Sequence, residues 1–125
     1  DKTVLIIDDS SSLRRLIKYS INRVYSNLNY VEASNGEDGL KILNSGASVD
    51  VIILDMHMPK MDGITFLKEK NKIENCRNIP TIVLTKKIDS ELKSEALQYG
   101  IIEYLPKPFN VTKVKQVLKK VLEEE

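Results

Sequence analysis

Short apolar segments that alternate with amphipathic segments constrain the fold of this 125-residue chain more strongly than any other feature. The run Val51–Leu54 is continuously apolar, rather than apolar at every second residue, which favours a strand buried on both faces of a parallel sheet. Strands are expected at residues 3–7, 30–33, 51–54, 79–85 and 101–105. Because a helical pattern follows each one, we expect an α/β fold in which helices cover both faces of one parallel sheet.

Polar caps and apolar faces mark the helices between these strands. Ser10 or Ser11 is positioned to cap the first helix, and Asp62 the third. Gly100, a residue type that commonly follows a helix end, should stop the fourth helix near Tyr99, and the fifth should begin after Asn110. The first helix is expected to carry on one buried face Leu13, Leu16, Ile17, Ile21 and Val24.

Composition limits the classes of function. The 19 basic and 18 acidic side chains give a net charge of +1, which offers no general attraction to nucleic acids or to membrane surfaces. No apolar run approaches the roughly 20 residues that a membrane-spanning helix needs. The single Cys76 excludes an internal disulfide and suits a reducing compartment. We therefore expect one domain over residues 1–125, located in the cytoplasm, with no direct contact to nucleic acid or membrane.

Polar side chains follow four of the expected strands at the point where each strand ends. They are Asp8 and Asp9 after the first, Asp55 after the third, Thr85 at the end of the fourth and Lys107 just beyond the fifth. The carboxyl ends of parallel strands lie along one edge of a sheet, so groups far apart in sequence converge there. Each residue alone could be a cap or a surface side chain, but their joint placement makes a shared site the better interpretation.

The expected cluster has the chemistry of phosphoryl transfer. Three carboxylates in one cleft repel one another and require a cation, and all-oxygen ligands favour Mg²⁺ over zinc or copper. The lone His57, with no Cys or second His beside it, argues against a soft-metal site. Lys107 and the metal would neutralise the oxygens of a phosphoryl group, Thr85 would donate a hydrogen bond, and a carboxylate would attack in line.

Four segments of the chain form a specific combination of motifs. They are Leu5–Ser10, Leu54–Gly63, Pro80–Thr85 and Tyr104–Phe109. This combination resembles the receiver domains of two-component response regulators, of the chemotaxis-regulator type, and it covers nearly the whole chain. The resemblance implies a flavodoxin-like, doubly wound sheet of five parallel strands in the order 2-1-3-4-5, with five helices. It also implies a signalling phosphoacceptor domain rather than a dedicated enzyme, with a histidine kinase as the phosphodonor.

The resemblance implies a magnesium-dependent acceptor site. Asp55 corresponds to the residue that receives the phosphoryl group. Mg²⁺ would be held by Asp9, Asp55 and the backbone carbonyl of His57. Asp8 would bind the ion through a water molecule.

The resemblance also implies how the signal leaves the site. Thr85 and Lys107 correspond to residues that bind the phosphoryl oxygens, and a cis Lys107–Pro108 peptide bond would aim the lysine. Tyr104 corresponds to the switch aromatic, which moves inward when the threonine hydroxyl turns toward the phosphoryl group. The fourth helix, fifth strand and fifth helix are therefore expected to contact a downstream protein or output domain.

One position departs from the family pattern. The residue after the switch threonine is usually alanine or another small residue, whereas here Lys86 and then Lys87 follow Thr85. A bulky cation beside the acceptor would either obstruct a phosphodonor or attract it. We expect instead that the Lys86 side chain extends away into solvent, as long charged side chains commonly do.

Three other function classes fit part of the pattern. A phosphohydrolase of the haloacid-dehalogenase type combines Asp, Thr, Lys and Mg²⁺, but it carries an Asp-x-Asp motif where this chain has the adjacent Asp8 and Asp9. A flavodoxin-like cofactor carrier needs a phosphate-binding first loop, and two carboxylates there would repel the phosphate. A receiver-like module that works by binding alone stays open because of Lys86, although the residues of the acceptor site are intact.

Overall fold

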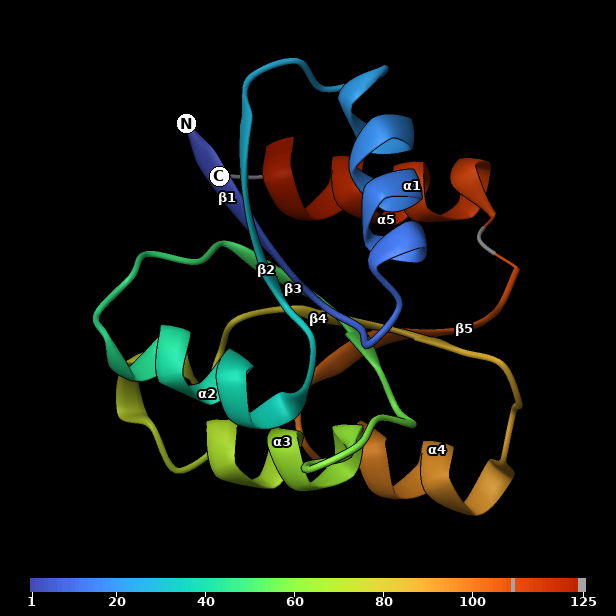
Figure 1. The fold of residues 1–125 in the computed structure, drawn as a ribbon. Coiled ribbons are helices and arrows are strands. Elements are labelled where there is room, and N and C mark those ends of the chain that lie inside the picture. The colour runs from blue at the N-terminus through green and yellow to red at the C-terminus, as the bar shows by residue number, and fades with distance from the viewer. Residues whose placement is uncertain (109, 124–125) are drawn as a thin grey trace.

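The computed structural model of the chain describes residues 1–108 and 110–123; Phe109, the last residue of an expected motif, and residues 124–125 lie outside it. Five strands alternate with five α-helices, and a short 3-10 helix precedes the fourth strand (Figure 1). In the described ranges, no helix has both the length and the apolar character needed to cross a membrane. In chain order the elements are β1 (Lys2–Ile7), α1 (Ser11–Asn22), β2 (Leu28–Ala33), α2 (Gly36–Asn44), β3 (Val51–Asp55), α3 (Gly63–Lys70), η1 (Glu74–Cys76), β4 (Thr81–Thr85), α4 (Ser90–Leu97), β5 (Ile101–Pro106) and α5 (Val111–Glu123).

The strands form one parallel sheet in the order β2-β1-β3-β4-β5, which confirms the predicted doubly wound fold. Helices α1 and α5 cover one face, and α2, α3 and α4 cover the other (Figure 1). Alternate residues of a strand point to opposite faces. Ile6 and Ile53 therefore pack with α1 and α5, whereas Ile7 and Leu54 pack with the other three helices. A sheet covered on both faces needs apolar residues at consecutive positions, which explains the continuous apolar runs.

The inner strands are the most deeply buried part of the molecule and carry the functional edge. Every residue of β3 and of β4 is buried. Ile7 of β1 pairs with Leu54 of β3, and Asp55 pairs with Leu84 of β4. The three strands therefore end at nearly the same level, so the residues that follow them share one edge of the sheet.

The first helix differs from the prediction at two positions. Its buried residues are Ile17, Ser20 and Ile21. Leu16, predicted to be buried, is 49% exposed because only the narrow strip spaced i, i+3 and i+4 faces the sheet, and Leu16 lies beside that strip. Val24 is 41% exposed and lies beyond the helix end at Asn22. The helix is thus shorter, and its buried face narrower, than the apolar pattern indicates.

The expected helix boundaries are otherwise close to those observed. Ser10, Asp62 and Asn110 accept hydrogen bonds from backbone N–H groups three residues later, at 3.1, 3.0 and 3.0 Å. Helix α4 ends at Leu97 rather than at Tyr99. The 3-10 helix η1 was not predicted, because three residues are too few to show a period.

Candidate functional site

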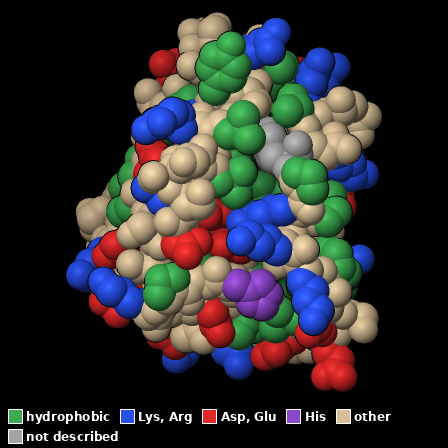
Figure 2. Space-filling view, turned by 45° about the vertical axis from the view of Figure 1, so that its right-hand side comes forward, with side chains coloured by type: hydrophobic (Ala, Val, Ile, Leu, Met, Phe, Trp, Pro, Cys, Tyr) green, Lys and Arg blue, Asp and Glu red, His purple; other side chains and the backbone are tan. Residues whose placement is uncertain are grey.

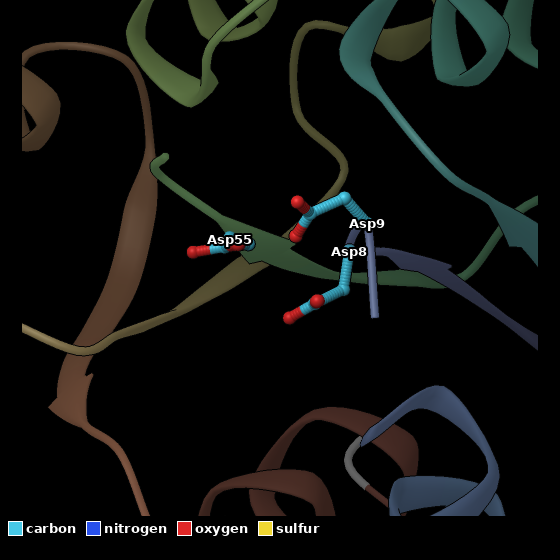
Figure 3. Close-up of side chains that lie close together, drawn as sticks. All are labelled: Asp8, Asp9 and Asp55. Carbon is cyan, nitrogen blue, oxygen red and sulfur yellow. The ribbon is translucent and has the colours of Figure 1, made fainter. Parts of the chain in front are cut away.

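The acidic cluster is built from the ends of two neighbouring strands. Because Ile7 pairs with Leu54, the next residues of the two segments, Asp8 and Asp55, lie side by side at this edge of the sheet. Figure 3 shows Asp8, Asp9 and Asp55 gathered at these strand ends. One oxygen from each of the three carboxylates lies within 4.8 Å of the others, with Asp8 and Asp55 buried and Asp9 exposed. The predicted convergence of the three carboxylates is therefore observed.

Lys107 reaches this cluster from the other end of the chain. Its Nζ lies 2.9 Å from Asp8 Oδ2 and 3.5 Å from Asp55 Oδ2. Its backbone N–H donates to the Thr85 carbonyl at 2.7 Å, which ties the end of β5 to the end of β4. The Lys107–Pro108 peptide bond is cis, as predicted. Only 11% of the Lys107 side chain is exposed, so water and salt screen its ion pairs weakly.

The surroundings of Asp55 disfavour its ionised form. Burial is the largest cause of its raised pKa, and the Asp8 carboxylate raises the pKa further, whereas Lys107 and the backbone N–H of His57 act in the opposite direction. That N–H donates to Asp55 Oδ1 at 3.3 Å. A buried carboxylate beside a second one gains more from an added cation than an exposed carboxylate does. The cluster therefore has the electrostatic character of a cation site.

The two expected switch residues, Thr85 and Tyr104, lie away from the carboxylates. Thr85 is fully buried, and its Oγ1 donates to the Lys87 carbonyl at 3.3 Å. Tyr104 pairs with Val83 across β4 and β5, and it packs in the same buried cluster as Ala96 of α4. Its phenolic oxygen is buried and has no hydrogen-bond partner among the described residues. Burial is the largest cause of the raised pKa of this phenol.

A pocket of about 530 Å³ opens over the cluster. Figure 2 shows acidic side chains next to basic ones and to the histidine on one face of the molecule. The predicted site residues in the pocket lining are Asp8, Asp9, Asp55, His57 and Lys107, whereas Thr85 and Tyr104 do not line it.

Three further residues line the pocket. Ser10 is indicated in the sequence by its place directly after the acidic pair, but only as a helix cap. Leu13 has no sequence signal beyond its place on the apolar face of α1. Lys86, which we expected to extend away into solvent, is exposed but borders the pocket.

The sequence pattern that defines the response regulator receiver domain matches residues 4–119. This chain belongs to the response regulator receiver family. Receiver domains are signalling phosphoacceptors rather than dedicated enzymes, and the buried acidic cluster is typical of their metal site. The comparison thereby sets aside the haloacid-dehalogenase-type and cofactor-carrier interpretations.

Curated relatives and solved structures agree with this assignment. The chain is 34% identical over 120 residues to chemotaxis protein CheY-3 of Vibrio cholerae, covering 96% of this chain and 91% of that protein. It is 34% identical over 126 residues to the sensor histidine kinase CheAY of Helicobacter pylori, covering 100% of this chain but only 15% of that protein. The structure of a CheX–CheY–BeF3–Mg²⁺ complex from Borrelia burgdorferi superposes with a TM-score of 0.81 at 30% identity, covering 97% of this receiver and 89% of that chain. Receiver domains thus occur with histidine kinases and with separate partner proteins.

Proposed function

We propose that Asp55 of this receiver domain accepts a phosphoryl group from a histidine kinase in a reaction that depends on Mg²⁺. The observation that carries the proposal is the convergence of Asp8, Asp9 and Asp55 at one pocket, with Lys107 paired to two of them. We assign the acceptor role to Asp55 because it corresponds to the phosphoacceptor of the receiver family; it is buried, carries a raised pKa and lies within reach of the Lys107 ammonium.

Asp55, Lys107 and Thr85 have separate roles in the transfer. A carboxylate oxygen of Asp55 attacks the phosphorus atom while the phosphorus–nitrogen bond to the kinase histidine breaks, and the electron pair leaves on the imidazole. Lys107, whose Nζ is 3.5 Å from Asp55 Oδ2, neutralises an oxygen of the incoming phosphoryl group. Thr85 exchanges the Lys87 carbonyl for a phosphoryl oxygen, because its single hydroxyl proton serves one acceptor at a time.

The residues present fit a magnesium ion. Asp8, Asp9 and Asp55 offer only oxygen ligands, and their three carboxylates face the single ammonium of Lys107. Asp9, Asp55 and the backbone carbonyl of His57 would hold the ion, with Asp8 acting through water. When bound, Mg²⁺ supplies positive charge to the phosphoryl oxygens during the transfer.

The proposed output surface comprises α4, β5 and α5. Tyr104 packs from β5 against α4, so a movement of its ring alters this surface. Leu97 of α4 is 56% exposed, and Ile102 of β5 is 42% exposed. A groove of about 860 Å³ lies along β5 and α5, and its lining includes Ile102, Val117 and Lys120. Exposed apolar side chains rimmed by polar ones are typical of surfaces that bind proteins, which supports a downstream protein or output domain as the partner.

In this proposal, residues 1–125 form one receiver domain that works in the cytoplasm. The near-neutral net charge supports a protein partner over nucleic acid or membrane lipid, since it offers no general attraction to anionic polymers or surfaces.

Phosphorylation by a small donor tests the assignment of Asp55. With acetyl phosphate and Mg²⁺, intact-mass spectrometry should detect one added phosphoryl group, and Asp55→Asn should abolish it. Chelation of the metal, or Asp9→Asn, should strongly reduce the adduct because the ion loses a ligand. Glu74→Gln, at an exposed position outside the cluster, is the matched control. An adduct that persists in Asp55→Asn would assign the acceptor role to another residue.

A further inference from the structure

Lys86 borders the acceptor pocket and has no part in the chemistry described above. It follows Thr85 at the carboxyl end of β4, and its exposed side chain lines the same pocket as the three carboxylates. Across the part of the chain that the structure describes, no carboxylate forms an ion pair with it. Its ammonium is therefore available to a ligand, whereas that of Lys107 is engaged with Asp8 and Asp55.

The balance of charge in the pocket determines which anions enter it. The three carboxylates and the Lys107 ammonium together have a net charge of −2, which repels an anionic phosphodonor. A bound divalent cation would bring this sum to zero, and Lys86 adds one further positive charge at the rim of the pocket. Clefts with low-dielectric walls focus such a field, so one charge at the mouth changes the local concentration of anions.

We propose that Lys86 is a specificity-determining residue of the acceptor site, which attracts dianionic small phosphodonors and favours them over monoanionic ones. This inference rests on the proposed function of Asp55 and names the class of donor that the pocket selects. Because Coulomb energy is proportional to charge, a dianion gains about twice as much from the ammonium as a monoanion does. The flexible stem of lysine lets the ammonium contact a donor at the rim without a fixed position inside the pocket.

The transfer needs no group beyond those already named. With acetyl phosphate, an oxygen of Asp55 forms a bond to phosphorus while the bond from phosphorus to the bridging oxygen breaks, and the electron pair leaves on acetate. With phosphoramidate, the phosphorus–nitrogen bond breaks instead, and the already protonated nitrogen leaves with the electron pair as ammonia. Acetyl phosphate is a dianion at neutral pH, and phosphoramidate is a monoanion. Lys86 neither gives nor takes a proton in either reaction.

A set of variants separates the effect of charge at position 86 from the effect of side-chain size. Lys86→Met keeps the length of the side chain without the charge, and Lys86→Arg keeps the charge. Lys87→Ala is the control, because the exposed Lys87 side chain does not line the pocket and its substitution keeps the backbone carbonyl that accepts from Thr85. The initial rate of Asp55 phosphorylation is measured for each protein by intact-mass spectrometry, with acetyl phosphate and with phosphoramidate, at low and high salt.

Lys86→Met should slow the reaction with acetyl phosphate about threefold to tenfold at low salt, and should slow the reaction with phosphoramidate by the square root of that factor, about twofold to threefold. The loss should shrink at high salt, because the attraction acts across solvent and is screened. Lys86→Arg and Lys87→Ala should stay near the wild-type rate with both donors. Equal losses for the two donors, or a loss in Lys87→Ala as large as in Lys86→Met, would overturn the proposal. A faster reaction in Lys86→Met would also overturn it, because the lysine would then be an obstruction.

Magnesium binding gives a readout that does not depend on turnover. The Lys86 ammonium repels the ion, so Lys86→Met should bind Mg²⁺ about twofold to threefold more tightly in titrations followed by amide chemical shifts, and Lys87→Ala should not. Unchanged affinity in Lys86→Met would contradict a charge effect at the pocket. If the wild-type protein gains no phosphoryl group at Asp55, the acceptor assignment fails, and this titration alone decides whether Lys86 acts on the charge of the pocket.

Discussion

The Asp55 side chain is 4% exposed and shares its pocket with a second buried carboxylate. Burial and the repulsion from Asp8 raise its pKa above the ordinary value of 3.8. A carboxyl group whose pKa is raised by folding stabilises the folded state fully only below its unfolded pKa, and this stabilisation is lost as the pH rises through the folded pKa. At neutral pH the ionised Asp55 is therefore a net cost to folding, which is offset in part by Lys107.

In metal-free buffer at pH 7, Asp55→Asn should raise the free energy of unfolding, because the neutral amide avoids the cost of ionising a buried carboxyl group beside Asp8. The advantage of the variant should diminish as the pH falls through the raised pKa of Asp55, because the wild-type carboxyl group then becomes protonated. Urea unfolding of both proteins across this range measures the effect, with Glu74→Gln as a control for loss of an exposed carboxylate. A wild type that is more stable than Asp55→Asn at pH 7 would contradict the electrostatic account.

At the scale of elements, the acceptor is positioned by the close approach of α3 to the end of β3. The Gly63 N–H donates to the Met56 carbonyl at 3.0 Å. A Cβ at position 63 would lie 2.7 Å from Met56 Cα and 2.8 Å from the Asp55 carbonyl oxygen, which are both backbone atoms. The start of the helix and the end of the strand are thus in direct backbone contact, and no side chain fits between them.

Gly63→Ala should reduce stability by about 1–3 kcal/mol, the usual cost of forcing an extra methyl group into a packed site. Because the clash falls on the residue after Asp55, the variant should also slow phosphorylation by acetyl phosphate. Gly46→Ala is a suitable control: Gly46 has φ 86° with no atom within 4 Å, so its substitution strains the backbone away from the site. It should lower stability by about 1 kcal/mol without changing the phosphorylation rate. Equal phosphorylation rates in both variants would show that the contact does not position the acceptor.

The sequence is sufficient to predict the elements and the acidic cluster, but not the orientations of several side chains. The cluster is predictable because parallel strands of similar length must end at one edge, wherever their residues lie in the chain. The buried ring of Tyr104 and the Thr85 hydrogen bond depend on rotamers and on the packing of α4, which leave no periodic signal. Lys70 illustrates the same limit: it looks like an ordinary helix-end lysine, yet it is fully buried and its Nζ donates to the Arg77 carbonyl.

At the scale of the whole molecule, β4 connects the acceptor pocket to the proposed output surface. Thr85 ends this strand, and Val83, two residues earlier, pairs with Tyr104 on β5. The ring of Tyr104 is buried and packs in the same cluster as Ala96 of α4. In the proposed switch, a change in the Thr85 hydroxyl would alter that packing and thereby bias the position of the ring.

Adding beryllofluoride, a phosphoryl mimic, with Mg²⁺ should shift the amide resonances of Tyr104 and of α4 in the wild-type protein. Thr85→Ala should reduce these distant shifts, because the hydroxyl that couples the site to the ring is gone. The shifts of residues in the acidic cluster should persist in both proteins, which serves as the internal control for binding of the mimic. Equal responses of Tyr104 and α4 in the two proteins would show that the coupling does not pass through Thr85.

The ion pair between Lys107 and Asp8 joins residues that are 99 positions apart. A ribosome makes all three carboxylates of the cluster before it makes β4 and β5, whereas Lys107 follows β5 in the sequence. A nascent or prematurely ended chain therefore holds a set of mutually repelling acids with no lysine to compensate them. The charge of the cluster is therefore compensated by Lys107 only after β5 has joined the sheet.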